Sequence, residues 1–109
     1  MRIALLCISM FCLIQGASSQ TEASLHFHHA CQRNAVGDTK SALAELDSSL
    51  SLKPGIDSAY CLRARLRFLE GDYKTAVKDL DKALHVNAAC FEAWYLRGLS
   101  KAGLEDYPG

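Results

Sequence analysis

The feature that most constrains this chain is an internal repeat of 34 residues. The segment GDTKSALAELDSSL at residues 37–50 reappears, with substitutions, as GDYKTAVKDLDKAL at residues 71–84. A further shift of 34 residues places the segment that begins at Ala59 over the segment that begins at Ala93, so a third copy has started before residue 109. Self-similarity at a fixed period of this size is typical of proteins that stack one supersecondary unit on the next.

Each copy has the pattern of two helices joined by a short turn. Apolar residues recur three and four positions apart, as they do on a helix with one buried side. In the second helix of the first two copies these residues are Ala42, Leu43, Leu46 and Leu50, and Ala76, Val77, Leu80, Ala83 and Leu84. Gly-Asp precedes each such helix. Glycine permits a tight turn, and the aspartate side chain can cap the first turn of the helix that follows. Pro54 and Gly55 are expected to end the first of these helices. Two antiparallel helices cannot bury their apolar faces alone, so we expect the copies to stack around a continuous core.

These copies resemble the tetratricopeptide repeat, a helix-turn-helix unit of 34 residues with a large residue at position 4, small residues at positions 8 and 20, and proline near its end. Counted from Ala23, Asp57 and Phe91, position 4 is His26, Tyr60 and Trp94, position 8 is Ala30, Ala64 and Gly98, and position 20 is Ala42 and Ala76. The resemblance implies an all-α, right-handed helix-turn-helix solenoid. Its repeats span residues 23–56, 57–90 and 91–109. The third repeat holds only its first helix, helix A, and the turn after it. LEDYPG at residues 104–109 matches the turn that precedes the second helix in the two earlier repeats, so we expect the chain to be truncated.

Residues 1–19 do not belong to the repeats and have the layout of a secretory signal peptide. Arg2 precedes an apolar run over residues 3–14, and small residues follow. The run is shorter than the roughly 20 residues that a membrane-spanning helix needs. We expect cleavage after Ser19, a short segment over residues 20–22, no membrane insertion after cleavage, and a location in the endoplasmic reticulum lumen or outside the cell. An uncleaved anchor or a misassigned start codon is the alternative.

Charge and cysteine content narrow the classes of partner. The twelve basic residues are balanced by twelve acidic ones, and this neutrality argues against binding to nucleic acid. The densest basic run, within residues 63–67, is confined to one short helix. After signal cleavage Cys31, Cys61 and Cys90 remain, so the chain can form at most one disulfide and keeps one free thiol.

The two helices of each unit carry complementary charges. The first helix, helix A, has bases at repeat positions 7 and 11, whereas the second helix, helix B, has acids at positions 23 and 25. The bases are His29, Arg33, Arg63, Arg67, Arg97 and Lys101. The acids are Glu45, Asp47, Asp79 and Asp81. Because charged groups near a core are normally paired, we interpret the pattern as ion pairing between helices. The acids of the second repeat should therefore lie near the arginines of helix A, in a structural role.

The segment HFHHAC at residues 26–31 is the one candidate for metal chemistry. His26 and His29 share a helix face and could hold zinc together with Cys31 or a carboxylate. The same repeat positions carry an aromatic residue and an arginine in the other copies, so packing between helices is the better interpretation, and we predict no metal site. His28 lies three residues before Cys31, one helical turn away, but no glycine-rich loop, second carboxylate constellation or phosphate cradle accompanies the pair. We therefore expect no catalytic residues, no cofactor and no enzymatic activity.

The resemblance places the ligand site on the concave face, formed by helix A positions 2, 5, 6, 9, 12 and 13. These positions are largely apolar here, and we predict ligand contacts from Phe27, Cys31, Leu62, Arg65, Tyr95 and Leu99. We expect the large apolar groups among them to be offered to water as an interaction patch. The subfamily that clamps the C-terminal carboxylate of cytosolic heat-shock chaperones needs lysine, asparagine and arginine at five such positions, where this chain has Phe27, Cys31, Leu62, Glu92 and Leu96.

We therefore expect a non-catalytic module that binds an apolar extended or helical segment of a protein or peptide partner. Together with a signal peptide, the repeats resemble lumenal tetratricopeptide co-chaperones and the substrate-binding domains of collagen hydroxylases, which hold unfolded or extended chains. The alternative is a structural fragment of a longer repeat protein, whose groove packs against later repeats and has no ligand of its own.

Overall fold

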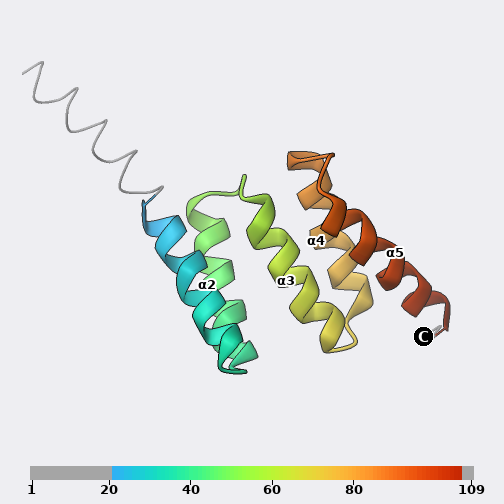
Figure 1. The fold of residues 1–109 in the computed structure, drawn as a ribbon, viewed down its shortest axis with the longest axis horizontal. Coiled ribbons are helices and arrows are strands. Elements are labelled where there is room, and N and C mark those ends of the chain that lie inside the picture. Colours follow the sequence, from blue (N-terminus) through green and yellow to red (C-terminus); the bar gives the residue numbers. More distant parts are fainter. Residues whose placement is uncertain (1–20, 107–109) are drawn as a thin grey trace, which may run out of the picture.

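The computed structural model describes residues 21–106 as a chain of helices without strands (Figure 1). A helix over residues 21–35 is followed by α2 (Thr39–Leu52), α3 (Asp57–Leu69), α4 (Tyr73–Val86) and α5 (Phe91–Asp106). The signal peptide expected over residues 1–19 lies outside the described residues. None of the helices within residues 21–106 combines the length and the apolar character that crossing a membrane requires.

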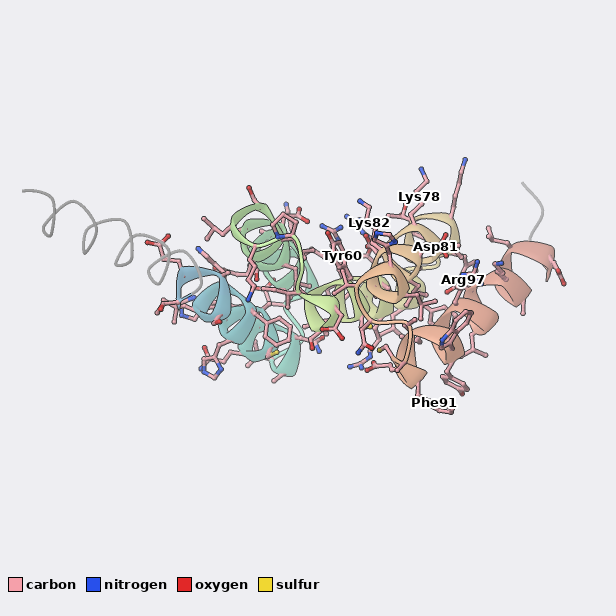
Figure 2. The ribbon with its side chains drawn as sticks, turned by 90° about the horizontal axis from the view of Figure 1, so that it is seen from above. Tyr60, Lys78, Asp81, Lys82, Phe91 and Arg97 are labelled. Atoms are coloured by element: carbon pink, nitrogen blue, oxygen red, sulfur yellow. The ribbon has the colours of Figure 1, made fainter. Side chains whose placement is uncertain are left out.

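The helices alternate between two layers, as a helix-turn-helix solenoid requires. The A helices are the helix over residues 21–35, α3 and α5, and the B helices are α2 and α4. Helix α3 is central and packs against α2, α4 and α5 (Figure 1). Seen from above, α4 lies along one edge with Lys78 and Lys82, and α5 lies along the other with Phe91 (Figure 2). Successive A helices therefore present one shared face of the molecule.

The two Gly-Asp turns have the conformation that their sequence predicts. Gly37 and Gly71 adopt φ values of 83° and 84°, a left-handed conformation that residues with a side chain rarely adopt. The following aspartates cap the next helices, because a carboxylate oxygen of Asp38 accepts from Ser41 N at 3.2 Å and one of Asp72 accepts from Thr75 N at 3.3 Å. Each turn thus reverses the chain and starts helix B in one step.

The core follows the predicted stripes and the small repeat positions. The fully buried side chains include the central leucine of each B helix, some of the B-helix alanines and the position-8 alanines of the first two A helices: Ala30, Ala42, Leu46, Ala64, Ala76, Leu80 and Ala83. Alanine at these places lets adjacent helices approach closely, and each leucine fills the space beside it. The repeat period is therefore also the period of the core.

The end of α5 differs from the sequence prediction. We assigned residues 104–109 to a turn, but Leu104, Glu105 and Asp106 are helical, and residues 107–109 lie outside the described residues. The position that is Gly71 in the second copy is Glu105 in the third. Because glutamate does not readily adopt the positive φ that stops the earlier A helices, α5 continues past this point.

Candidate functional site

A hollow opens on the face formed by the A helices. It has a volume of about 210 Å³, and its lining comes from all three A helices and from the turn before α5: Phe27, Cys31, Asp57, Ser58, Cys61, Leu62, Arg65, Cys90 and Glu92. The side chains come from neighbouring repeats because the 34-residue period brings equivalent positions side by side. A hollow of this size can receive one large side chain of a ligand, and a longer segment would lie across several A helices.

Four of the six predicted ligand-binding residues line this hollow, namely Phe27, Cys31, Leu62 and Arg65. Leu62 is only 7% exposed, so it forms part of the floor and is not offered to water as we expected. Leu96, at the same repeat position, is also 7% exposed. The physical reason is that position 6 of helix A points into the core between the layers in this chain.

Tyr95 and Leu99 lie outside the hollow but continue from its rim. Their exposed fractions are 61% and 38%, and Glu92, which lines the hollow, precedes them on the same helix by three and seven residues. Residues at these spacings share one face of a helix. Two exposed apolar side chains therefore lie on the side of α5 that borders the hollow.

The charged groups at the rim are already paired with one another. Arg65 of α3 forms an ion pair with Glu92 of α5. A carboxylate oxygen of Asp57 accepts a hydrogen bond from Asn87 Nδ2 at 3.0 Å. These pairs link α3 to the neighbouring segments across the edges of the hollow. The rim therefore offers polarity without a strong net charge, above an apolar floor.

Two thiols meet at the hollow. Cys61 Sγ and Cys90 Sγ lie 3.6 Å apart, and the cysteines at positions 31, 61 and 90 are all free thiols. Burial, and then the hydrogen bond with Cys90, raise the pKa of Cys61 to about 12. That Cys90 is the neighbour of Cys61 could not be predicted from the sequence, because Cys90 lies in the turn before α5, whose conformation the repeat pattern does not determine. Cys61 is a small buried hydrophobe here, whereas Cys31 is exposed.

The predicted ion pairs between helices are confirmed at position 7. Arg63 donates from Nε and Nη2 to the two carboxylate oxygens of Asp79 at 3.0 and 2.7 Å, and from Nη1 to Asp47 at 2.8 Å. Arg97 Nε donates to Asp81 at 2.6 Å, and Figure 2 shows the two side chains facing each other between α5 and α4. Burial acts to lower the pKa of Arg63, but hydrogen bonds and charge from both aspartates outweigh it and raise the pKa.

Position 11 behaves differently from position 7. Within residues 21–106, Arg33 and Arg67 make no ion pair with the acids of helix B, and the buried Nε of Arg67 has no hydrogen-bond partner. Positions 7 and 11 lie one helical turn apart, and of these two only position 7 holds residues within ion-pair distance of the helix-B acids in residues 21–106. The predicted pairing is therefore right for one of the two rows of bases.

In the histidine-rich segment, the structure separates the histidines from the cysteine. His26 Nδ1 lies 2.6 Å from a carboxylate oxygen of Glu45, and His29 Nδ1 lies 3.9 Å from the same oxygen. Cys31 instead lines the hollow with Phe27. The hydrogen bond from His26, the main cause, lowers the pKa of Glu45. Both histidines contact Glu45 of helix B as interhelix residues, and Glu45 is one of the helix-B acids that the charge pattern predicted to pair with helix A.

Comparison with known proteins identifies the fold. No family model and no curated protein matches the sequence. Among solved structures, the chain is similar to the first tetratricopeptide domain of Spaghetti (RPAP3) bound to the HSP90 peptide SRMEEVD, with a TM-score of 0.77 and 17% identity over 80% of this chain and 69% of that one. It is also similar to the MamA protein, with a TM-score of 0.75 and 16% identity over 79% of this chain and 47% of that one. The chain thus spans less than half of MamA, and these likenesses show a tetratricopeptide-type solenoid fold.

Proposed function

We propose that this chain is a non-catalytic protein-interaction module, and that its A-helix face holds an apolar extended or helical segment of a partner protein. The observation that carries the proposal is the hollow with its apolar floor on the A-helix face, together with the exposed side chains of Tyr95 and Leu99 on the same side of α5 as Glu92 at its rim. Apolar patches of this kind on soluble proteins commonly mark interaction sites. A peptide-bound structural neighbour with the same fold supports the same use of the repeats.

The chemistry of the hollow favours an apolar ligand over an acidic one. The neighbour's peptide, SRMEEVD, carries three acidic side chains and a C-terminal carboxylate. Arg65, the one basic residue that lines the hollow here, is already paired with Glu92. Binding a carboxylate would require breaking that pair, and Phe27 and Leu62 supply no replacement donor. An apolar side chain loses nothing by entering, because it leaves the pair at the rim intact.

A role in holding unfolded or extended chains in the secretory pathway extends the proposal. It rests on the signal-like composition of residues 1–19 and on the absence of a carboxylate clamp from the sequence. Unfolded chains present apolar side chains without a fixed sequence, which suits a shallow apolar surface with a mildly polar rim. A structural unit with no ligand of its own is the competing function.

The test replaces the exposed part of the surface and leaves its buried floor alone. A Tyr95→Lys/Leu99→Lys variant adds two charges where an apolar segment would lie, and we expect it to lose most of its capture of an immobilised, reduced and alkylated polypeptide. Because both side chains are exposed in the free chain, the helical circular dichroism spectrum should be unchanged. The measurement is the bound fraction as a function of chain concentration.

A matched control carries the same charges on the other layer. Leu52→Lys/Val86→Lys changes two exposed apolar residues at the ends of α2 and α4, and its capture should equal that of the unchanged chain. If both double variants capture the unfolded polypeptide equally well, the A-helix face is not the binding site. Tighter binding of SRMEEVD than of the unfolded polypeptide would contradict the apolar chemistry of the ligand.

A further inference from the structure

The first repeat brings two imidazoles and a carboxylate together between its helices, and we propose that His26, His29 and Glu45 bind a divalent transition-metal ion such as Zn²⁺. The histidines lie three residues apart on the helix over residues 21–35, and Glu45 reaches them from α2. The repeat positions of the two histidines favoured interhelix packing, because the other copies carry an aromatic residue and an arginine there. The position of the carboxylate, which the sequence did not give, changes that interpretation.

The ligand atoms are close to the separations that a metal ion requires. One ring nitrogen of His26, one ring nitrogen of His29 and a carboxylate oxygen of Glu45 all lie within 4.8 Å of one another. With bonds of about 2.0 to 2.2 Å, two ligands of a tetrahedral zinc ion lie about 3.4 Å apart. The observed distances to the carboxylate oxygen are 2.6 and 3.9 Å, so they lie on either side of that value. Small side-chain rotations, without movement of the two helices, would bring both nitrogen–oxygen distances to about 3.4 Å.

Comparison of the first two repeats shows that the first lacks the positive charge that pairs with the helix-B carboxylate in the second. In the second repeat the positions of His29 and Glu45 are Arg63 and Asp79, and the guanidinium neutralises the carboxylate through two hydrogen bonds. In the first repeat the carboxylate faces two imidazoles, which carry charge only when protonated. Among residues 21–106, Arg33 acts on Glu45 at longer range and forms no ion pair with it. A bound dication would take the place that Arg63 fills one repeat later.

The side chains also fit a particular class of ion. Imidazole nitrogen suits zinc, copper and nickel, whereas magnesium and calcium prefer oxygen ligands. All three side chains are partly exposed, so a water molecule can complete the coordination sphere. The ion would join the two helices of the first repeat and stabilise their packing.

The experiment uses the full chain, purified without a polyhistidine tag. Equilibrium dialysis against Zn²⁺ should give one ion per chain, and Zn²⁺ should raise the melting temperature, because a ligand that binds only the folded state stabilises it. Mg²⁺ should do neither. His29→Gln and Glu45→Gln each remove one ligand and nearly preserve side-chain size, and each should weaken zinc binding at least about tenfold, since even loss of an outer contact costs that much.

Two controls separate this site from other ligands on the chain. His28→Gln alters the exposed histidine between the two proposed ligands and should bind zinc as the unchanged chain does. Cys90→Ser removes one thiol of the Cys61–Cys90 pair and should also leave binding unchanged. Loss of binding in Cys90→Ser with retention in His29→Gln would place the ion at the thiols and overturn the proposal. Equal binding in all variants, or none in the unchanged chain, would overturn it too.

Discussion

The two junctions between repeats use the same arginine position with very different surroundings. At the first junction Arg63 reaches Asp47 of the preceding repeat, whose side chain is 58% exposed, and it also reaches Asp79 of its own repeat, whose side chain is only 4% exposed. At the second junction Arg97 reaches Asp81 of the preceding repeat alone, and that side chain is 52% exposed. The arginine and the preceding aspartate are 16 residues apart in both cases. The period therefore fixes which groups pair, whereas burial decides how much the pair stabilises.

The apolar parts of the junctions differ in a complementary way. Cys61 and Cys90 at the second junction take the repeat positions of Phe27 and Ile56 at the first. Phe27 and Ile56 both pack against the core as partly buried side chains. The second junction carries a thiol pair where the first has larger apolar groups, and the Arg65–Glu92 ion pair also crosses it. Four experiments can test whether the two junctions differ in this way.

The largest expected effect is on thiol reactivity. A pKa of about 12 for Cys61 leaves on the order of a thousandfold less thiolate than an ordinary cysteine has near neutral pH, because each unit is tenfold. We expect iodoacetamide to label Cys31 rapidly and Cys61 slower by about that factor, as read by mass spectrometry of tryptic peptides. The rate at Cys61 should approach that at Cys31 in denaturant. Equal rates in the folded chain would mean that the second junction is open in solution.

The next effect concerns the two ion pairs. Asp79→Asn leaves Arg63 partly buried with only Asp47, and we expect a loss of about 2 to 4 kcal/mol in the free energy of unfolding, as when one partner of a buried pair is removed. Asp81→Asn disrupts an exposed pair and should cost less than about 1 kcal/mol. Urea unfolding followed by circular dichroism measures both. If the two variants lose equal stability, burial does not distinguish the junctions.

A third prediction compares two glycines of α5. A Cβ at Gly103 would lie 2.9 Å from ring atoms of Tyr73 on α4, whereas a Cβ at Gly98 would meet nothing within 4 Å. Gly98→Ala should therefore gain up to about 1 kcal/mol from helix propensity. Gly103→Ala should lose that gain to overpacking, which typically costs about 1 to 3 kcal/mol. Their melting temperatures should move apart, and a parallel rise would show that α5 does not pack on Tyr73 as described.

Much of the fold could be predicted from the sequence because the same pattern of turn, core and charged residues occurs in both complete repeats. The Gly-Asp turns, the core stripes of α2 and α4, and the pairing of position 7 all recur with the period, so each copy supports the other. The end of α5 could not be predicted in this way, because Glu105 stands where the earlier copy has Gly71 and the copies no longer agree. A periodic argument fails where the period itself is broken.

The candidate site was less predictable, for two physical reasons. Leu62 was expected on the surface, but a position number does not say how far a side chain turns toward the core, and this depends on the packing of both neighbouring repeats. The contacts of Glu45 and Cys90 join different elements of the chain. A single sequence gives no distance between such elements, so these groups became visible only once α2 and the turn before α5 were in place.

The smallest expected effect tests a contact that only the first repeat has. Ser49 Oγ donates a hydrogen bond to the carbonyl oxygen of Ala23 at 2.8 Å, and both residues are buried, so α2 is tied to the start of the first A helix. The equivalent residue in the second repeat is Ala83. Ser49→Ala should therefore lower the free energy of unfolding by about 1 kcal/mol, the usual net value of one such bond, and leave the second repeat unaffected. Hydrogen exchange locates the loss: protection should fall in residues 21–35 and stay constant in α4. A uniform fall across both segments would mean that the two repeats unfold as one unit, and that the contrast between their junctions has no energetic consequence of its own.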